Sequence, residues 1–196
     1  MEERWVFGYG SLMWRPGFVF EEEHPARLRG AHRSLCVYSH VHRGTAERPG
    51  LVLGLDRGGS CRGVAFRIAP QRWDETLAYL RAREQATSVY VEATRPVTLL
   101  GAASRVVPAL CYLVDRRHPQ YAGALTLDTQ FDLVSQGEGR SGRNVDYVLA
   151  TVEHLAELGV DDPELRALAE RLLASRRQDS ERVSPLPPRV RSGRRP

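Results

Sequence analysis

One run near the start of the chain decides its fold: Trp5-Val6-Phe7-Gly8-Tyr9-Gly10-Ser11-Leu12-Met13-Trp14-Arg15-Pro16-Gly17-Phe18. Its apolar opening predicts a short strand that ends at Gly8. Two glycines flanking one residue allow positive φ and close approach of a ligand, so successive N–H groups can hold a carboxylate or an oxyanion. A tight turn at the end of a strand is the alternative. The run lacks the spacing of a phosphate-binding loop and of a nucleophile elbow.

Outward from this run, the first two thirds of the chain alternate apolar stretches with turn signals. Further strands are predicted at 34–39, 51–55, 61–68, 89–100 and 105–114, with a break at Arg57-Gly58-Gly59-Ser60. One helix interrupts them, from Pro70 to Glu84. The last third predicts helices at 127–136, 144–158 and 163–175. Strands followed by segregated helices predict an α+β fold, with a small curved sheet or barrel surrounded by helices.

Length and composition limit the function classes. A chain of 196 residues with 42% hydrophobic content fits a single domain. Its apolar runs are shorter than the ~20 residues of a membrane helix, and the N-terminus lacks a signal-peptide pattern, so we expect a soluble cytoplasmic protein. Cys36, Cys61 and Cys111 are odd in number and lie among apolar neighbours, which predicts reduced core cysteines.

The basic excess collects at the C-terminal end. All 28 basic residues are arginines, the net charge is +4, and the last stretch is rich in arginine and proline. Its charge, prolines and lack of periodicity predict a disordered tail at 176–196 that follows a domain at 1–175. Nucleic-acid binding through this tail is an alternative function, which the near-neutral remainder of the chain does not favour.

Glu84 is the candidate catalytic carboxylate. Trp73, Leu77 and Leu80 recur at helical spacing, and at ~100° per residue Glu84 falls on the same stripe. Burial there, and the negative end of the helix dipole, would raise its pKa toward the range of a general base near neutral pH. The alternative is a helix that ends by Arg83, with Glu84 in solvent or paired with an arginine.

Joined together, the opening run and Glu84 resemble ChaC-type glutathione-specific γ-glutamyl cyclotransferases. Supporting stretches follow in the family's order: His42-Arg43-Gly44, Arg48-Pro49-Gly50, Gly63-Val64-Ala65-Phe66, Tyr79-Leu80 through Arg83-Glu84, and Ser141-Gly142-Arg143-Asn144 with Tyr147. The resemblance covers most of residues 5–175. One departure affects the pocket: many members follow the glutamate with a glycine pair and a tyrosine, whereas this chain reads Gln85-Ala86-Thr87-Ser88-Val89-Tyr90.

The resemblance implies a γ-glutamyl-cyclotransferase-like fold, no cofactor or metal, and release of 5-oxoproline and cysteinylglycine from glutathione. It also implies that Glu84 is the base and that the opening loop holds the γ-glutamyl group. We add an arginine and two tyrosines as candidates for the substrate's carboxylate or peptide remainder. The predicted substrate-binding residues are Phe7, Gly8, Tyr9, Gly10, Ser11, Leu12, Arg43, Tyr90 and Tyr147.

Other functions stay open at this point. A metal hydrolase would use His40 and His42, which share a face if 38–42 is extended, with His32 upstream; zinc-site spacings that would support it are absent from the sequence. A non-catalytic module on the same fold would sense a small acidic ligand. A sister activity would cyclise other γ-glutamyl amines or dipeptides. The sequence leaves the oligomeric state open.

Overall fold

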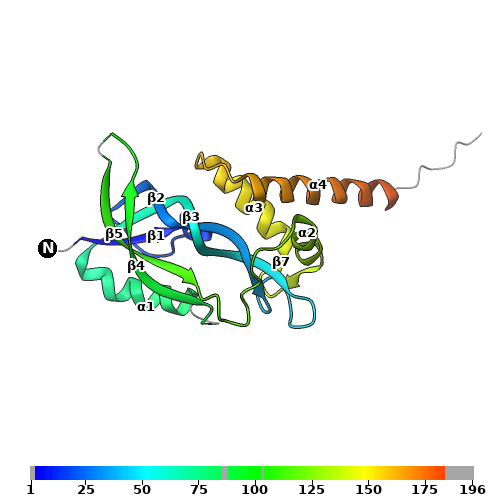
Figure 1. The fold of residues 1–196 in the computed structure, drawn as a ribbon, viewed down its shortest axis with the longest axis horizontal. Helices are drawn as coiled ribbons and strands as arrows, with labels where there is room; N and C mark the ends of the chain where they lie inside the picture. The colour runs from blue at the N-terminus through cyan, green and yellow to red at the C-terminus, as the bar shows by residue number, and fades with distance from the viewer. Residues whose placement is uncertain (1–2, 85–87, 103, 184–196) are drawn as a thin grey trace, which may run out of the picture.

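A small closed barrel forms one part of the molecule, and a group of helices packs at one end of it (Figure 1). The computed structural model describes residues 3–84, 88–102 and 104–183. The strands are β1 (Arg4–Gly8), β2 (Glu22–Ser39), β3 (Gly50–Ile68), β4 (Tyr90–Leu99), β5 (Arg105–Val114), β6 (Glu138–Gly139) and β7 (Gly142–Arg143). The helices are η1 (Ser11–Met13), η2 (Pro70–Arg72), α1 (Trp73–Glu84), α2 (Leu127–Gln136), α3 (Asn144–Glu157) and α4 (Pro163–Val183). The predicted α+β class is confirmed.

The barrel closes in the strand order β1-β3-β2-β4-β5. Neighbouring strands in this order are antiparallel except at the closure, where β1 pairs in parallel with β5 through Trp5 and Val6. In addition, β3 pairs in parallel with β5 at Leu55 and Leu113. The largest fully buried side chains include Trp5, Phe7, Phe66 and Tyr112, from three different strands. Phe66 is paired with Val6, so it lies on the opposite face of the barrel wall from Phe7, and buried rings pack on both faces around β1. The end of β1 is therefore held firmly where the opening run leaves the sheet.

Two long strands replace the shorter ones that we predicted. Arg57-Gly58-Gly59-Ser60, predicted as a break, lies inside β3, where Gly58 and Gly59 have φ of +99° and +67°. The register of β2 against β3 shifts beside them, between Arg29 and Ala31. The glycines therefore form a bulge within a continuous pair of strands rather than a turn. The break was predicted because glycine is common both in turns and in bulges.

The helices follow the prediction except at the end of the chain. Helix α2 has the predicted bounds, and α1 with η2 covers Pro70 to Glu84 as expected. Helix α4 continues to Val183, so the prediction of a disordered tail from Arg176 onward is wrong for Arg176–Val183. Arg176 donates a hydrogen bond to Asp146 on α3, which ties this extension to the helix group. Residues 184–196 lie outside the described residues.

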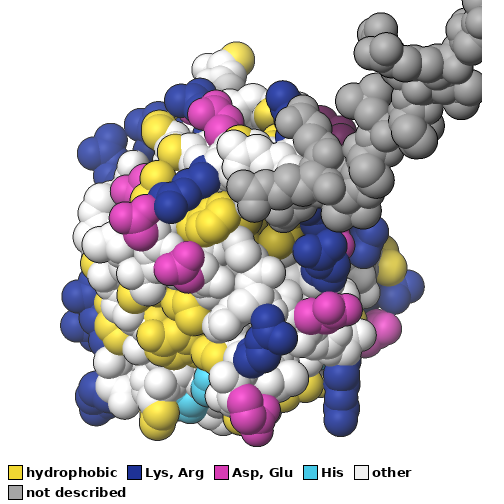
Figure 2. Space-filling model, turned by 90° about the vertical axis from the view of Figure 1, so that its right-hand side faces the viewer, with side chains coloured by type: hydrophobic (Ala, Val, Ile, Leu, Met, Phe, Trp, Pro, Cys, Tyr) yellow, Lys and Arg dark blue, Asp and Glu magenta, His cyan; other side chains and the backbone are white. Residues whose placement is uncertain are grey.

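The arginines of α4 are largely engaged by acidic partners. Arg166 pairs with Asp161, and Arg171 pairs with Asp128 of α2. Figure 2 shows basic and acidic side chains interspersed with apolar ones on the face at this end of the molecule. This mixed charge is typical of a solvated helix face rather than of a groove that follows a phosphate backbone.

Two further expectations concern the core and the membrane. Cys36, Cys61 and Cys111 are buried and unpaired, as predicted. Among residues 3–84, 88–102 and 104–183, none of the helices has the length and apolarity that crossing a bilayer requires. Burial raises the pKa of the Cys36 thiol to about 12, so this thiol is protonated and unreactive at neutral pH.

The helix group is docked on the barrel by one buried amide. Oδ1 of Asn144 accepts a hydrogen bond from the Leu51 N–H at 2.6 Å, and Nδ2 donates to the Leu51 carbonyl at 2.8 Å. Asn144 is fully buried at the first residue of α3. The amide thus pairs with β3 as a neighbouring strand would, and it fixes where α3 begins.

Replacing Asn144 by alanine tests this docking. The change leaves two buried backbone groups of Leu51 without partners, at about 1–3 kcal/mol each, so we expect a total loss of about 2–6 kcal/mol. Urea unfolding measures it, with the exposed Gln71→Ala as a control that should stay within about 0.5 kcal/mol of the parent. A loss below about 1 kcal/mol for Asn144→Ala would show that water replaces the amide.

Candidate active site

A cavity of about 400 Å³ opens where the β1–η1 loop, β3, the end of α1 and α3 meet. This volume is within the usual range for small-molecule sites, about 300–1,000 Å³. Its lining residues are Tyr9, Gly10, Ser11, Leu12, Arg15, His42, Arg43, Val52, Leu53, Arg83, Glu84, Tyr90, Ser141 and Tyr147. The structure therefore brings together most of the predicted site residues, although they are far apart in sequence.

Phe7 and Gly8 are the two predicted residues that do not line the cavity. The Phe7 side chain is fully buried in the barrel. A Cβ on Gly8 would come within 3.1 Å of the Leu12 Cβ and 3.3 Å of Phe66. Gly8 therefore allows η1 to pack closely on β1. The positive φ that we expected is found at neither Gly8 nor Gly10, so that reason for the glycine pair is wrong.

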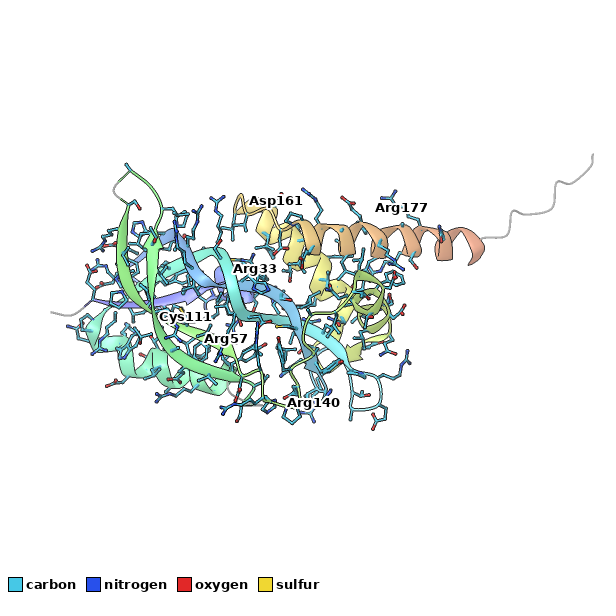
Figure 3. All side chains as sticks on the ribbon, viewed as in Figure 1. Arg33, Arg57, Cys111, Arg140, Asp161 and Arg177 are labelled. Atoms are coloured by element: carbon cyan, nitrogen blue, oxygen red, sulfur yellow. The ribbon has the colours of Figure 1, made fainter. Side chains whose placement is uncertain are left out.

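The loop that follows β1 is anchored to the barrel by Arg33 of β2 (labelled in Figure 3). Its Nε donates to the Tyr9 carbonyl at 2.6 Å, and its Nη2 donates to the Arg62 carbonyl at 2.7 Å. The guanidinium also lies 3.4 Å from Asp162, just before α4, and its side chain is only 4% exposed. One buried cation thus joins the loop, the barrel and the helix group.

Glu84 is the last residue of α1, and its side chain is 18% exposed. Burial raises its pKa above the usual value, and the Arg83 guanidinium opposes part of this increase. The Arg83 Nε lies 3.1 Å from the Glu84 Oε1. The helix reaches Glu84 and turns it toward the cavity as predicted, and the pairing with an arginine, posed as the alternative, exists as well.

Arg83 also connects the helix end with the β1–η1 loop. Its Nη2 donates to the Ser11 Oγ at 2.8 Å, and its Nη1 donates to the Arg15 carbonyl at 2.8 Å and to the Tyr79 hydroxyl at 3.0 Å. Sequence reasoning did not include Arg83 among the site residues. The signal that could have identified Arg83 as a site residue was its position next to Glu84, in the stretch Tyr79-Leu80 through Arg83-Glu84 that resembles the family.

Three tyrosines line the cavity close to Glu84. Burial raises the pKa of Tyr9, Tyr90 and Tyr147, so all three are neutral near pH 7. The Tyr90 hydroxyl donates to the Leu53 carbonyl at 2.7 Å, whereas the Tyr147 hydroxyl accepts from the Leu53 N–H at 3.2 Å. Tyr90 has therefore used its proton, and Tyr147 keeps its proton for a ligand in the cavity.

Arg43 supports the wall of the cavity. Its Nη1 donates to the Ser141 carbonyl at 2.5 Å and contacts the Arg143 carbonyl at 3.3 Å. Its guanidinium carbon lies 5.2 Å from the centre of the Tyr147 ring, in a cation–π contact. Arg43 thus holds the β6–β7 turn and Tyr147 in place, instead of extending into solvent from its loop.

The histidines of the metal-site alternative have separate partners. The ring of His32 pairs with the Gly58 carbonyl at 3.1 Å, His42 pairs with the Ser141 Oγ at 3.0 Å, and His40 stacks on Tyr38. In the part of the chain that the structure describes, His, Cys, Asp and Glu side chains form no cluster of three suited to a metal ion.

The segment after Glu84 is the one that the sequence analysis noted as a departure from the family's usual pattern. Gln85, Ala86 and Thr87 lie outside the described residues. Ser88 follows them with φ of +57°, in the left-handed region that favours glycine. Ser88 therefore occupies a backbone conformation that glycine adopts more easily, just before the chain enters β4 at Tyr90.

Barrel, loop and carboxylate together define the class of protein. The structure matches a crystal structure of a yeast γ-glutamyl cyclotransferase specific to glutathione with a TM-score of 0.80, covering 89% of this chain and 97% of that one at 23% identity. The chain therefore has the γ-glutamyl-cyclotransferase-like fold. The family described as ChaC-like protein matches residues 4–175, and the chain belongs to this family.

Relatives with assigned names support the same grouping. The glutathione-specific γ-glutamylcyclotransferase of Escherichia coli (strain K12) is 35% identical over 84% of this chain and 70% of its own length. The glutathione-specific γ-glutamylcyclotransferase 1 of Danio rerio is 33% identical over 87% of this chain and 89% of its own. The resemblance stated from the sequence is confirmed.

Arg83→Met tests the electrostatics of the site. The substitution removes the cation that opposes the effect of burial, so we expect the pKa of Glu84 to rise further. Titration of the Glu84 side-chain carboxyl by carbon NMR measures it. Arg81→Met is the matched control, because Arg81 lies on the same helix but pairs with Glu92. A Glu84 pKa that falls or stays constant in Arg83→Met would contradict the prediction.

Proposed function

We propose that the chain cyclises the γ-glutamyl group of glutathione, releasing 5-oxoproline and cysteinylglycine. The observation that carries the proposal is the placement of Glu84: a largely buried carboxylate on a cavity that the β1–η1 loop also lines. Relatives named as glutathione-specific γ-glutamylcyclotransferases support the choice of substrate. The bond that forms joins the α-nitrogen to the carbonyl carbon of the γ-amide, and the bond that breaks is the one between this carbon and the amide nitrogen.

Positioning supplies much of the rate enhancement. The α-amine and the γ-carbonyl belong to the same glutamyl unit, so a cavity that folds this unit makes the attack intramolecular, with a very large effective concentration. Tyr147 has a hydroxyl proton to offer the glutamyl α-carboxylate, and Arg43 behind its ring adds positive charge. These two residues would fix one end of the glutamyl unit while its γ-carbonyl faces the loop.

Glu84 moves the proton. A free α-amine has a pKa of about 8 and is mostly protonated at neutral pH, so it must lose a proton before it attacks. The Glu84 carboxylate, with its raised pKa, accepts this proton and then donates it to the amide nitrogen that leaves as the amine of cysteinylglycine. Arg83 keeps the carboxylate oriented through its contact at 3.1 Å.

The β1–η1 loop stabilises the oxyanion in this scheme. Ser11 and Leu12 begin the short helix η1, and the first N–H groups of a helical turn have no acceptor within it. A well-aimed backbone donor of this kind contributes about 3–4 kcal/mol to the transition state in other enzymes. Arg33 and Arg83 anchor the loop on two sides, so its donors need little reorganisation during the reaction.

Two assignments made from the sequence are part of the proposal. A reducing, cytoplasmic location fits three cysteines that are buried and unpaired. A catalytic domain at 1–175 fits a cavity whose lining residues all precede α4. On this division, removal of 176–196 would remove the last part of α4 without touching the cavity.

Glu84→Gln tests the reaction and the base together. Purified protein is incubated with reduced glutathione, and 5-oxoproline and cysteinylglycine are followed by mass spectrometry. We expect a loss of about 10²–10⁴-fold in rate, the usual contribution of a general base. Glu75→Gln is the matched control, since Glu75 lies on the same helix with a side chain 76% exposed, and it should keep full activity.

Three outcomes separate the alternatives. Products from the wild type alone would support the proposal. Release of 5-oxoproline only from other γ-glutamyl amines would assign the sister activity. Binding of glutathione without any turnover would assign a non-catalytic module.

A further inference from the structure

The cavity has a buried end and an exposed rim. Tyr9 and Leu12 are buried beside Glu84, whereas Arg15, His42 and Ser141 are exposed where the cavity opens. A tripeptide whose γ-glutamyl end lies against Glu84 must therefore direct its other end toward this rim. Two residues of extended chain span about 7 Å, so the distal carboxylate of the tripeptide emerges near the opening.

Three arginines line the cavity, and two of them are committed to protein partners. Arg83 contacts Glu84, Ser11 and the Arg15 carbonyl. Arg43 holds the Ser141 carbonyl and lies over the Tyr147 ring. Neither can turn toward a substrate without breaking contacts that shape the site.

Arg15 differs from both. Its backbone is fixed, because its N–H donates to the Ser11 carbonyl at 2.8 Å and its carbonyl accepts from Arg83 at 2.8 Å. Its guanidinium, in contrast, makes no ion pair or hydrogen bond with any residue within 3–84, 88–102 or 104–183. An anchored backbone with an uncommitted charged end at the rim is suited to binding an anion from the substrate.

We infer that Arg15 binds the C-terminal carboxylate of the tripeptide and thereby selects glutathione over γ-glutamyl amines that lack this group. The inference rests on the proposed function for the identity of the substrate. A guanidinium and a carboxylate form two parallel hydrogen bonds, a geometry that an amide or an alkyl end cannot provide. Loss of such a charged contact reduces affinity about tenfold.

Binding measurements on a Glu84→Gln background test this without turnover. The two ligands are glutathione and glutathione whose C-terminal carboxylate is a primary amide. With Arg15 present, we expect the acid to bind about tenfold more tightly than the amide. With Arg15→Gln added, acid and amide should bind equally, because the acid weakens and the amide does not change. Arg15→Lys should restore part of the preference.

A matched control removes charge elsewhere. Arg29→Gln changes the net charge equally, and Arg29 is exposed on β2 and does not line the cavity, so the tenfold ratio should persist. An acid-to-amide ratio that is the same with and without Arg15 overturns the inference, as does a ratio near one when Arg15 is present.

Kinetics on proteins that retain Glu84 separate this inference from the proposed function. Arg15→Gln should raise KM for glutathione about tenfold, leave kcat within about twofold, and leave both constants for the amide unchanged. An equal rise in KM for both peptides would overturn the role of Arg15. Failure of the wild type to release 5-oxoproline from either peptide would overturn the proposed function, while the binding ratio would still decide whether Arg15 recognises the carboxylate.

Discussion

The structure depends on one stretch of β3 that pairs with β2 on one side and with none of the described strands on the other. At Leu51 and Leu53, the backbone groups facing away from β2 pair with side chains: Asn144 with Leu51, and Tyr147 and Tyr90 with Leu53. Buried backbone groups must be paired, so these side chains are constrained before any ligand is considered. The cavity lies beside this gap in the sheet, because Tyr90 and Tyr147, which pair with Leu53, also line the cavity.

The β1–η1 loop is constrained in a comparable way, by hydrogen bonds from two charged guanidinium groups instead of from amide and hydroxyl side chains. Arg33 holds the Tyr9 carbonyl from the barrel side, and Arg83 holds the Ser11 hydroxyl from the end of α1. Because the two arginines come from different elements, the loop is fixed relative to both the sheet and Glu84. A loop held in this way has its N–H groups in position before the reaction begins, which is the condition for efficient oxyanion stabilisation.

Helical periodicity and the family resemblance were enough to predict part of the site from the sequence. Helical periodicity directed Glu84 toward the core, and the quoted stretches contained Arg43 and Tyr147. Pattern could not predict that Arg15, His42 and Ser141 share one rim, because their proximity is produced only by the tertiary fold. The glycine signals inside β3 were misinterpreted because bulges and turns use the same residue. The arginine- and proline-rich composition of 176–196 likewise led to a prediction of disorder from Arg176, although α4 continues to Val183.

The pairing of Arg83 with Glu84 resolves two conflicting demands on the base. Burial alone raises the pKa of Glu84, which strengthens it as a base but favours its protonated, inactive form. The neighbouring guanidinium limits this rise and so keeps the carboxylate ionised more of the time. In the proposed reaction Glu84 takes a proton from the substrate, and the contacts of Arg83 with Ser11 and the Arg15 carbonyl do not involve the Glu84 carboxylate. On the proposed mechanism, the loop's anchors are therefore independent of the charge on Glu84, so proton transfer and oxyanion stabilisation would not require the loop to move.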